Sequence, residues 1–373
     1  MGALTRFFRS SWGVSLLYLI AFNILVRLVA TVGYPLLPEH YAPLSFIAPL
    51  LRSKFIFWSF ANFDGEHYLS IAAYGYHVRN GFPQYAFFPL YPLLIKAVSL
   101  VVRDYLVAAL IVSQGSLWVA LTVLGKWSKI IKRTYAPWFL LIAPGAIFLA
   151  SAYTESVFLA LAVLTFYFAE RGWWGRAALA VALATATRVN GLLLVIFLAI
   201  KFWQHRVSLL RLAGRLLIAT SGILAYMGYL WSKTGDPLAW YHAQAAWGKE
   251  TATSPVTTAL SYFRAISVDF HPDLTHLVVI FEVVVTLTAL ALFLYAAKKK
   301  LFDLSYLVYL AGNLVLPLAT GSLGSMPRFY LTLFPLYAVV PLLPKTPRTM
   351  YYGVSIGIAA IGIILFTRGW WFG

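Results

Sequence analysis

The sequence predicts an all-α integral membrane protein, a polytopic chain with about eleven transmembrane helices. Hydrophobic residues make up 61% of the 373 residues and charged residues only 11%, whereas charged residues approach a quarter of a soluble globular chain. Long apolar runs follow one another along the whole sequence, and the basic residues form short clusters at the ends of those runs. Such clusters mark the cytoplasmic loops of membrane proteins.

Charge and cysteine content exclude several classes of protein. The net charge of +17 arises from basic clusters beside apolar runs, so no nucleic-acid partner is implied. The chain has no cysteine, which excludes disulfides, thiolate metal sites and cysteine nucleophiles. The sequence shows no short repeat and no low-complexity tract. We therefore expect a single transmembrane domain over residues 1–373.

The first apolar run, residues 12–37, is too long for the core of a signal peptide and is expected to be the first span. Two arginines precede this run and place its start in the cytoplasm. The next basic cluster, residues 126–133, must lie on the same side. Residues 105–125 therefore return across the membrane, and residues 38–104 form a first external loop.

Two apolar segments of this loop are unsuited to crossing the membrane. Residues 87–102 are only about 16 residues long and contain Lys96, which favours a re-entrant or interfacial helix. Residues 50–60 mix Arg52 and Lys54 with aromatic side chains and predict another interfacial helix.

Apolar runs and basic clusters alternate over the rest of the chain. The expected crossings are residues 137–152, 154–169, 216–231, 277–297, 304–320 and 329–343, followed by a last span that ends before Arg368. A second long external segment covers residues 232–275.

Residues 177–200 differ from the other apolar runs. They lie between Arg176 and Lys201, which both favour the cytoplasm, yet they carry Arg188 and Asn190 at their centre. We expect two short helices that meet at a turn facing outward.

Polar residues without a role in topology all fall at the outer ends of the expected spans. They are Asp64, Glu66, His67, Tyr153, Glu155, Arg188, Asn190, Asp236 and Arg328. Ionisable residues at membrane depth indicate functional sites, and we expect these residues to converge on one external cavity. Carboxylates mixed with arginines suit general-base chemistry on a ligand that carries a phosphate.

The stretch of residues 62–68 places two carboxylates and a histidine among aromatic residues. Asp64 is either a reactive group or the N-cap of a helix. Glu66 is a metal ligand, a second acid or a loop residue, and we favour a supporting role. His67 is better suited to hydrogen bonding than to metal binding, since no second histidine lies at ligand spacing. We assign no metal residues, although two carboxylates could hold a divalent cation.

The remaining candidates also have structural alternatives. Glu155 could balance the charge of Arg188 or Arg328. Arg188 lies too deep for a simple loop residue, which favours phosphate binding. Arg328 could bind a donor or extend to the outer headgroups. Gln244 and Trp247 have helical spacing, which would also fit a helix on the membrane surface.

Short motifs run through nearly the whole chain. They are FDGEHY at residues 63–68, AFFPLYP at 86–92, AYTES at 152–156, ATATRVNG at 184–191, GDPL at 235–238 with Gln244 and Trp247 beyond it, and MPRFY at 326–330. Taken together they resemble the PIG-V family, whose eukaryotic members add the second mannose to glycosylphosphatidylinositol (GPI) precursors. One departure is Phe63, where the family usually has tryptophan; the carboxylate that follows is unaffected.

The resemblance implies the GT-C class of glycosyltransferase, a polyprenyl- or dolichyl-phosphate mannose donor, and inversion of the anomeric carbon on the extracytoplasmic or lumenal face. It implies that Asp64 is the general base for an acceptor hydroxyl, assisted by Glu66. Arg188 and Arg328 would bind the donor phosphate. The expected substrate-binding residues are His67, Tyr153, Glu155, Asn190, Asp236, Gln244 and Trp247.

Two alternatives come from other functions. One is a GT-C enzyme that uses another lipid-phosphate sugar for cell-surface glycans or for protein glycosylation. The other is a lipid or sugar transporter, which the interruption at residues 188–191 disfavours because it has no counterpart in the other half of the chain. The expected partners are the lipid-phosphate donor, a glycan or glycolipid acceptor, and membrane lipids. The location would be the cell membrane of a prokaryote or the endoplasmic reticulum membrane of a eukaryote.

Overall fold

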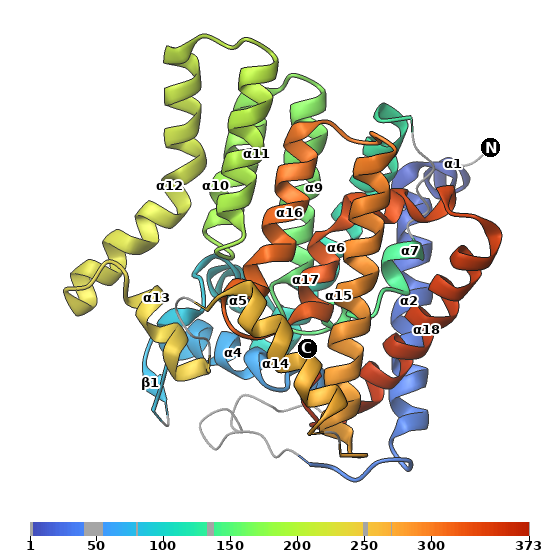
Figure 1. Ribbon diagram of the computed structural model, residues 1–373. Helices are drawn as coiled ribbons and strands as arrows, with labels where there is room; N and C mark the ends of the chain where they lie inside the picture. The colour runs from blue at the N-terminus through green and yellow to red at the C-terminus, as the bar shows by residue number, and fades with distance from the viewer. Residues whose placement is uncertain are drawn as a thin grey trace.

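The computed structural model describes residues 3–40, 55–79, 81–132, 138–248, 253–269 and 271–372. Within these ranges the chain is helical apart from loops and one hairpin of β1 (Val78–Arg79) and β2 (Phe82–Pro83), in which Val78 faces Pro83 (Figure 1). The helices, with η for a short 3₁₀ helix, are α1 (Ala3–Arg9), α2 (Ser11–Gly33), α3 (Phe55–Trp58), η2 (Ser59–Ala61), α4 (Asp64–Tyr74), η3 (Gln84–Ala86), α5 (Leu90–Val102), α6 (Tyr105–Ile130), α7 (Trp138–Leu141), α8 (Ala146–Ala150), α9 (Glu155–Glu170), α10 (Trp174–Thr185), α11 (Gly191–Gln204), α12 (Leu209–Thr234), α13 (Ala239–His242), η4 (Ala243–Trp247), α14 (Pro255–Ser267), α15 (Leu274–Lys298), α16 (Leu304–Ala319), α17 (Met326–Thr332), η5 (Phe334–Ala338), η6 (Val340–Leu342) and α18 (Lys345–Thr367).

Five of the described helices, α2, α6, α12, α15 and α18, are long and apolar enough to cross a membrane. Asp104 begins α6 by accepting a hydrogen bond from the Val107 amide at 2.9 Å, and Asp273 begins α15 in the same way from the His276 amide. The all-α membrane class is thereby confirmed. The number of crossings stays a prediction.

The expected pair of short helices within residues 177–200 is confirmed. It consists of α10 and α11, which are joined by the turn at residues 186–190. Gly191 permits this turn, because a Cβ at that position would lie 2.6 Å from the backbone nitrogen of Thr185. The turn places Arg188 and Asn190 between the two helix ends.

Two expected spans are not single helices, which corrects that part of the prediction. Residues 138–150 form α7 and α8 with Pro144 between them, and residues 329–343 are divided among α17, η5 and η6. Proline removes a backbone donor and cannot continue a helix interior. The two broken segments touch, since a Cβ on Gly145 would lie 2.1 Å from the carbonyl oxygen of Pro327.

The first external loop contains short helices. The 13 residues of α5 extend about 20 Å, less than the roughly 30 Å of a hydrocarbon core. This helix packs on α6, where Tyr91 donates a hydrogen bond to the Ala109 carbonyl at 3.1 Å. A short helix in this segment agrees with the expectation, and its placement in the membrane stays a prediction. Of the predicted helix at residues 50–60, only residues 55–60 lie in the described part of the chain, in α3 and η2.

The two ends of the helix bundle differ (Figure 1). The connections from α9 to α10, from α11 to α12 and from α15 to α16 lie at one end, and α4, the hairpin, α13 and α14 lie at the other. The first end carries the basic clusters at residues 171–176, 206–215 and 298–300. It therefore corresponds to the predicted cytoplasmic side.

A buried ion-pair cluster ties the helices together at this basic end. Lys201 of α11, which is 3% exposed, contacts Glu170 of α9 at 2.6 Å and Asp303 beside α16 at 2.7 Å. Tyr306 donates a further hydrogen bond to Glu170 at 2.9 Å. Glu170 and Asp303 thus both neutralise one lysine.

Ser208 and Ser254 form a matched pair for a test of sidedness. Each is an exposed serine directly before a helix, and the two helices begin at opposite ends of the bundle (Figure 1). The chain has no cysteine, so one introduced cysteine gives a clean signal. In sealed vesicles with the extracytoplasmic face outward, we expect Ser254→Cys to react with an impermeant thiol reagent and Ser208→Cys to react only after permeabilisation. The opposite pattern would invert the predicted orientation.

Candidate functional site

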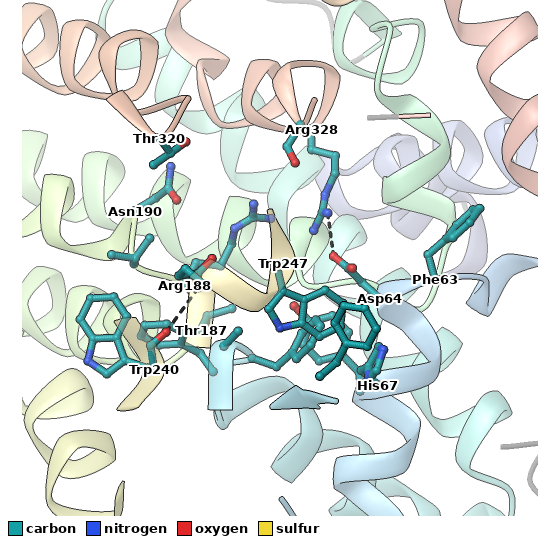
Figure 2. Close-up of a pocket in the computed structure, with 18 of the residues that line it drawn as sticks. Phe63, Asp64, His67, Thr187, Arg188, Asn190, Trp240, Trp247, Thr320 and Arg328 are labelled. Atoms are coloured by element: carbon teal, nitrogen blue, oxygen red, sulfur yellow. Dashed lines mark hydrogen bonds and ion pairs between the residues drawn. The ribbon is translucent and has the colours of Figure 1, made fainter. Parts of the chain in front are cut away.

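A cavity of about 650 Å³ opens at the end of the bundle that carries α4 and α13 (Figure 2). Seven of the predicted site residues line it: Asp64, His67, Arg188, Asn190, Gln244, Trp247 and Arg328. They come from α4, the α10–α11 turn, η4 and α17, which are far apart in the sequence. The expected convergence on one cavity therefore holds for these seven. Glu66, Tyr153, Glu155 and Asp236 are not part of its lining.

Asp64 is positioned by a strained turn. Phe63 has φ 61° and ψ −117°, a conformation that normally requires glycine and costs about 1–3 kcal/mol in other residues. This turn starts α4 at Asp64, so the carboxylate lies in the first turn of the helix, where the helix dipole favours negative charge. No side chain caps α4. Asp64 is therefore not an N-cap, and its carboxylate is used in another contact.

That contact is an ion pair with Arg328. The Nη1 atom of Arg328 lies 2.7 Å from Oδ2 of Asp64, and its Nε atom lies 2.8 Å from Oε1 of Glu155 (Figure 2 shows the first contact). Nη1 of Arg188 donates to the same Glu155 oxygen. The order of groups is thus Arg188, Glu155, Arg328, Asp64, with the signs of charge alternating along the network.

Glu155 is the centre of this network. Its side chain is fully buried, and Arg328 is only 8% exposed. Two guanidinium groups that contact the same carboxylate oxygen would repel each other without it, and a buried charge without a partner is costly. The shared carboxylate lets Arg188 and Arg328 stand side by side. Arg328 does not extend toward the lipid headgroups, so the snorkelling alternative is wrong.

Two aromatic rings pack against the guanidinium group of Arg328. The guanidinium carbon lies 5.0 Å from the ring centre of Tyr153 and 5.3 Å from that of Phe148, within the range of cation–π contacts. The Tyr153 hydroxyl donates to the Asn62 carbonyl at 2.8 Å. Tyr153 therefore holds both Arg328 and the segment before Asp64 in place. Its own side chain is not part of the cavity lining.

Asn190 joins the α10–α11 turn to α16 and α17. Its Nδ2 atom donates to Oδ1 of Asn313 at 2.9 Å, and the Thr332 hydroxyl donates to the same oxygen at 3.1 Å. Asn313 and Thr332 are buried. This network holds Arg188, which precedes Asn190 in the turn, against the helix that carries Arg328.

His67 lies in an aromatic cage. Its ring stacks on Phe87 at 5.1 Å and meets Trp247 edge-on at 4.8 Å, and its Nδ1 lies 3.2 Å from Nε2 of Gln84. Burial lowers the pKa of His67 to about 4, and the nearby charge of Asp64 opposes that shift only in part. The imidazole is therefore neutral at physiological pH and contributes hydrogen bonding rather than positive charge.

Of the four predicted residues outside the cavity lining, Glu66 and Asp236 belong neither to the ion-pair network nor to its aromatic support. Glu66 is buried in α4 at 1% exposure. Asp236 is on the surface, where Oδ2 lies 2.7 Å from Nδ1 of His242 and Oδ1 accepts from the Leu238 amide at 2.8 Å. The hydrogen bond from His242 lowers the pKa of Asp236. Asp236 thus shapes the start of α13, and α13 in turn contributes Trp240 and Tyr241 to the cavity.

The cavity combines its charged groups with an aromatic wall. Residues that the sequence analysis did not assign to the site also line it, among them Arg79, Phe82, Tyr241, Phe329 and Trp371. The four aromatic residues in this set gave a weak signal in the sequence, since 17% of the chain is aromatic. In the described ranges no group of three or more His, Cys, Asp or Glu is arranged to hold a metal ion. The carboxylates of the network are bound by arginines instead.

The chain is similar in sequence to known mannosyltransferases. The model of the family described as mannosyltransferase (PIG-V) matches residues 2–217, more than half of the chain. GPI alpha-1,6-mannosyltransferase 2 of Homo sapiens is 30% identical over 176 residues, and the protein of that name from Cricetulus griseus is 26% identical over 206 residues. These matches cover 43% and 48% of this chain but only 35% and 40% of the two relatives. The family match includes Asp64, Glu155 and Arg188, and Arg328 lies beyond its end.

Removal of the charge at the centre of the network should destabilise the fold. Glu155→Gln leaves two buried guanidinium groups without their shared carboxylate, which costs about 3–5 kcal/mol of unfolding free energy for a buried pair. The measurement is thermal unfolding of the purified protein in detergent. Asp236→Asn, which removes an exposed carboxylate, is the matched control and should change the unfolding temperature little. Equal unfolding temperatures for the two variants would contradict the central role of Glu155.

Proposed function

Because the chain belongs to the PIG-V mannosyltransferase family, we propose that it transfers mannose from a polyprenyl- or dolichyl-phosphate donor to an acceptor hydroxyl. The reaction takes place on the extracytoplasmic or lumenal face of the membrane and inverts the anomeric carbon. One observation carries this proposal: two arginines held side by side by Glu155 stand next to the carboxylate of Asp64 in a cavity wall. The chain spans well under half the length of the curated relatives that it matches.

The two arginines are suited to a lipid phosphate. Guanidinium groups bind phosphate oxygens through paired, charge-assisted hydrogen bonds. Arg188 and Arg328 both line the cavity and are held in place before any ligand arrives. In the proposed reaction they bind the donor phosphate and stabilise the negative charge that grows on it as it leaves.

Asp64 is the general base in this scheme. The acceptor oxygen attacks the anomeric carbon as the bond from that carbon to the phosphate oxygen breaks. The acceptor proton moves to the Asp64 carboxylate, and the electron pair of the broken bond remains on the phosphate. Arg328 holds Oδ2 of Asp64, and we assign the proton to the other oxygen.

The other residues position these three groups. Tyr153 and Glu155 hold Arg328 through a cation–π contact and an ion pair, and Asn190 holds the turn that carries Arg188. Glu66 has a supporting role inside α4. His67, Gln244 and Trp247 line the wall on which substrate binds. No step requires a metal ion, because two guanidinium groups face the leaving phosphate.

The names of the relatives indicate the class of acceptor. They act on GPI by name, and we extend to this chain a glycan or glycolipid acceptor. The protein lies in the cell membrane or in the endoplasmic reticulum membrane. Lipids of that membrane serve as the acceptor and the donor.

The function and the base can be tested together. Wild-type protein incubated with polyprenyl-phosphate mannose and extracted membrane lipids should yield a new mannosylated species by mass spectrometry. Asp64→Asn keeps the size of the side chain but cannot accept a proton, so turnover should fall by about 10² to 10⁴. Glu66→Gln, two residues along the same helix, should reduce turnover less. Full activity in Asp64→Asn would transfer the role of base to another carboxylate, and a product formed only with a different lipid-phosphate sugar would change the donor.

Arg188→Lys tests the phosphate site. Lysine keeps the positive charge but loses the planar, two-pronged donor, so the KM for polyprenyl-phosphate mannose should rise and kcat should fall by about tenfold or more. Arg176→Lys, at the opposite end of α10, is the matched control and should leave both constants unchanged. Normal constants in Arg188→Lys would assign that residue a structural role only.

A further inference from the structure

The chain returns to the site after α18. Trp371 lines the same cavity as Phe63 and Asp64. Its ring meets that of Phe63 edge-on, with 5.1 Å between the ring centres and 88° between the planes. Two aromatic rings from distant parts of the sequence thus contact each other and form an aromatic surface in the cavity that holds the proposed base.

The segment that carries Trp371 is fixed to the first external loop. Nε of Arg368 donates to the Leu37 carbonyl at 2.8 Å, and the His40 amide donates to the Arg368 carbonyl at 2.9 Å. The ring of Trp370 stacks on that of His40, with 3.9 Å between centres. These contacts hold the backbone on the N-terminal side of Trp371.

The backbone on the other side is held as well. Phe372 is fully buried, and its ring is parallel to that of Phe148 at 6.4 Å. Trp370 and Phe372 therefore pack against the protein, whereas Trp371 between them is 40% exposed and contributes to the cavity wall. A large aromatic ring is thus held at the site by its two neighbours and is open to a ligand.

The position of this surface identifies the part of the reaction that it serves. In Figure 2 Arg188 and Phe63 lie on opposite sides of Asp64. On the proposed function, the donor phosphate occupies the side of the arginines. Inversion requires the acceptor oxygen to approach the anomeric carbon from the side away from the phosphate. The acceptor therefore reaches Asp64 from the side of Phe63 and Trp371.

We propose that Trp371, together with Phe63, binds the acceptor through a ring that bears or adjoins the reacting hydroxyl. The proposal rests on the proposed function. Aromatic faces bind the apolar C–H face of a sugar ring, and the ring hydroxyls remain free for polar groups at the rim. Trp371 would thus position the sugar of the glycan or glycolipid acceptor, and a flexible peptide side chain offers no such ring.

The test separates acceptor binding from donor binding. Transfer from polyprenyl-phosphate mannose is measured while a total lipid extract from the producing cells is titrated as the acceptor probe, and then with the donor titrated at saturating extract. Trp371→Ala should raise the half-saturating amount of extract by roughly five- to tenfold and leave the donor KM unchanged. Trp371→Phe, which keeps an aromatic face, should restore most of the acceptor binding.

A matched control is available in Trp173, which is 41% exposed at the opposite end of the bundle. Trp173→Ala should change neither value, and all variants should keep the wild-type unfolding temperature. Equal half-saturation in Trp371→Ala and wild type, or a matching rise in donor KM, would overturn the inference and leave the proposed function intact. No transfer by wild-type protein would overturn the proposed function and the inference with it.

Discussion

The site depends on one constraint, the need to hold two buried guanidinium groups next to each other. Glu155 holds them together by accepting hydrogen bonds from both Arg188 and Arg328. Because Glu155 is buried, its attraction to the two arginines is strong. Three of the elements that line the cavity carry a member of this network. α4 contributes Asp64 to one end, the α10–α11 turn contributes Arg188 to the other, and α17 supplies the arginine between them.

Interrupted helices make that arrangement possible. A continuous span directs its side chains around a cylinder, whereas a helix end presents its first residues along the axis. Glu155, Arg188 and Arg328 all lie at or near such ends, in α9, the α10–α11 turn and α17. Non-helical backbone at membrane depth is tolerated where protein surrounds it, and Thr154 and Thr187 beside the network are buried.

Much of this could be predicted from the sequence. The cost of charge in an apolar chain identified Asp64, Arg188 and Arg328, and the charges on either side of residues 177–200 identified the helical pair. The broken spans at residues 138–150 and 329–343 were missed because hydrophobicity measures burial and does not distinguish a helix from packed short segments. Asp236 was expected in the cavity but lies on the surface, because the sequence does not distinguish an acid that lines a site from one that stabilises a turn. Trp371 was missed because its position depends on the packing of residues 37–40, which no local pattern encodes.

The alternating network also acts as a filter on ligands. The two acids and the two arginines balance one another in charge, so an incoming molecule must compete with carboxylates for the guanidinium groups. A neutral ligand offers weaker acceptors than the carboxylates already in place, whereas an anionic phosphate group can form charge-assisted hydrogen bonds of its own with the arginines. Such self-neutralisation exchanges some affinity for selectivity, because only a ligand with a negative charge of its own replaces what the arginines lose.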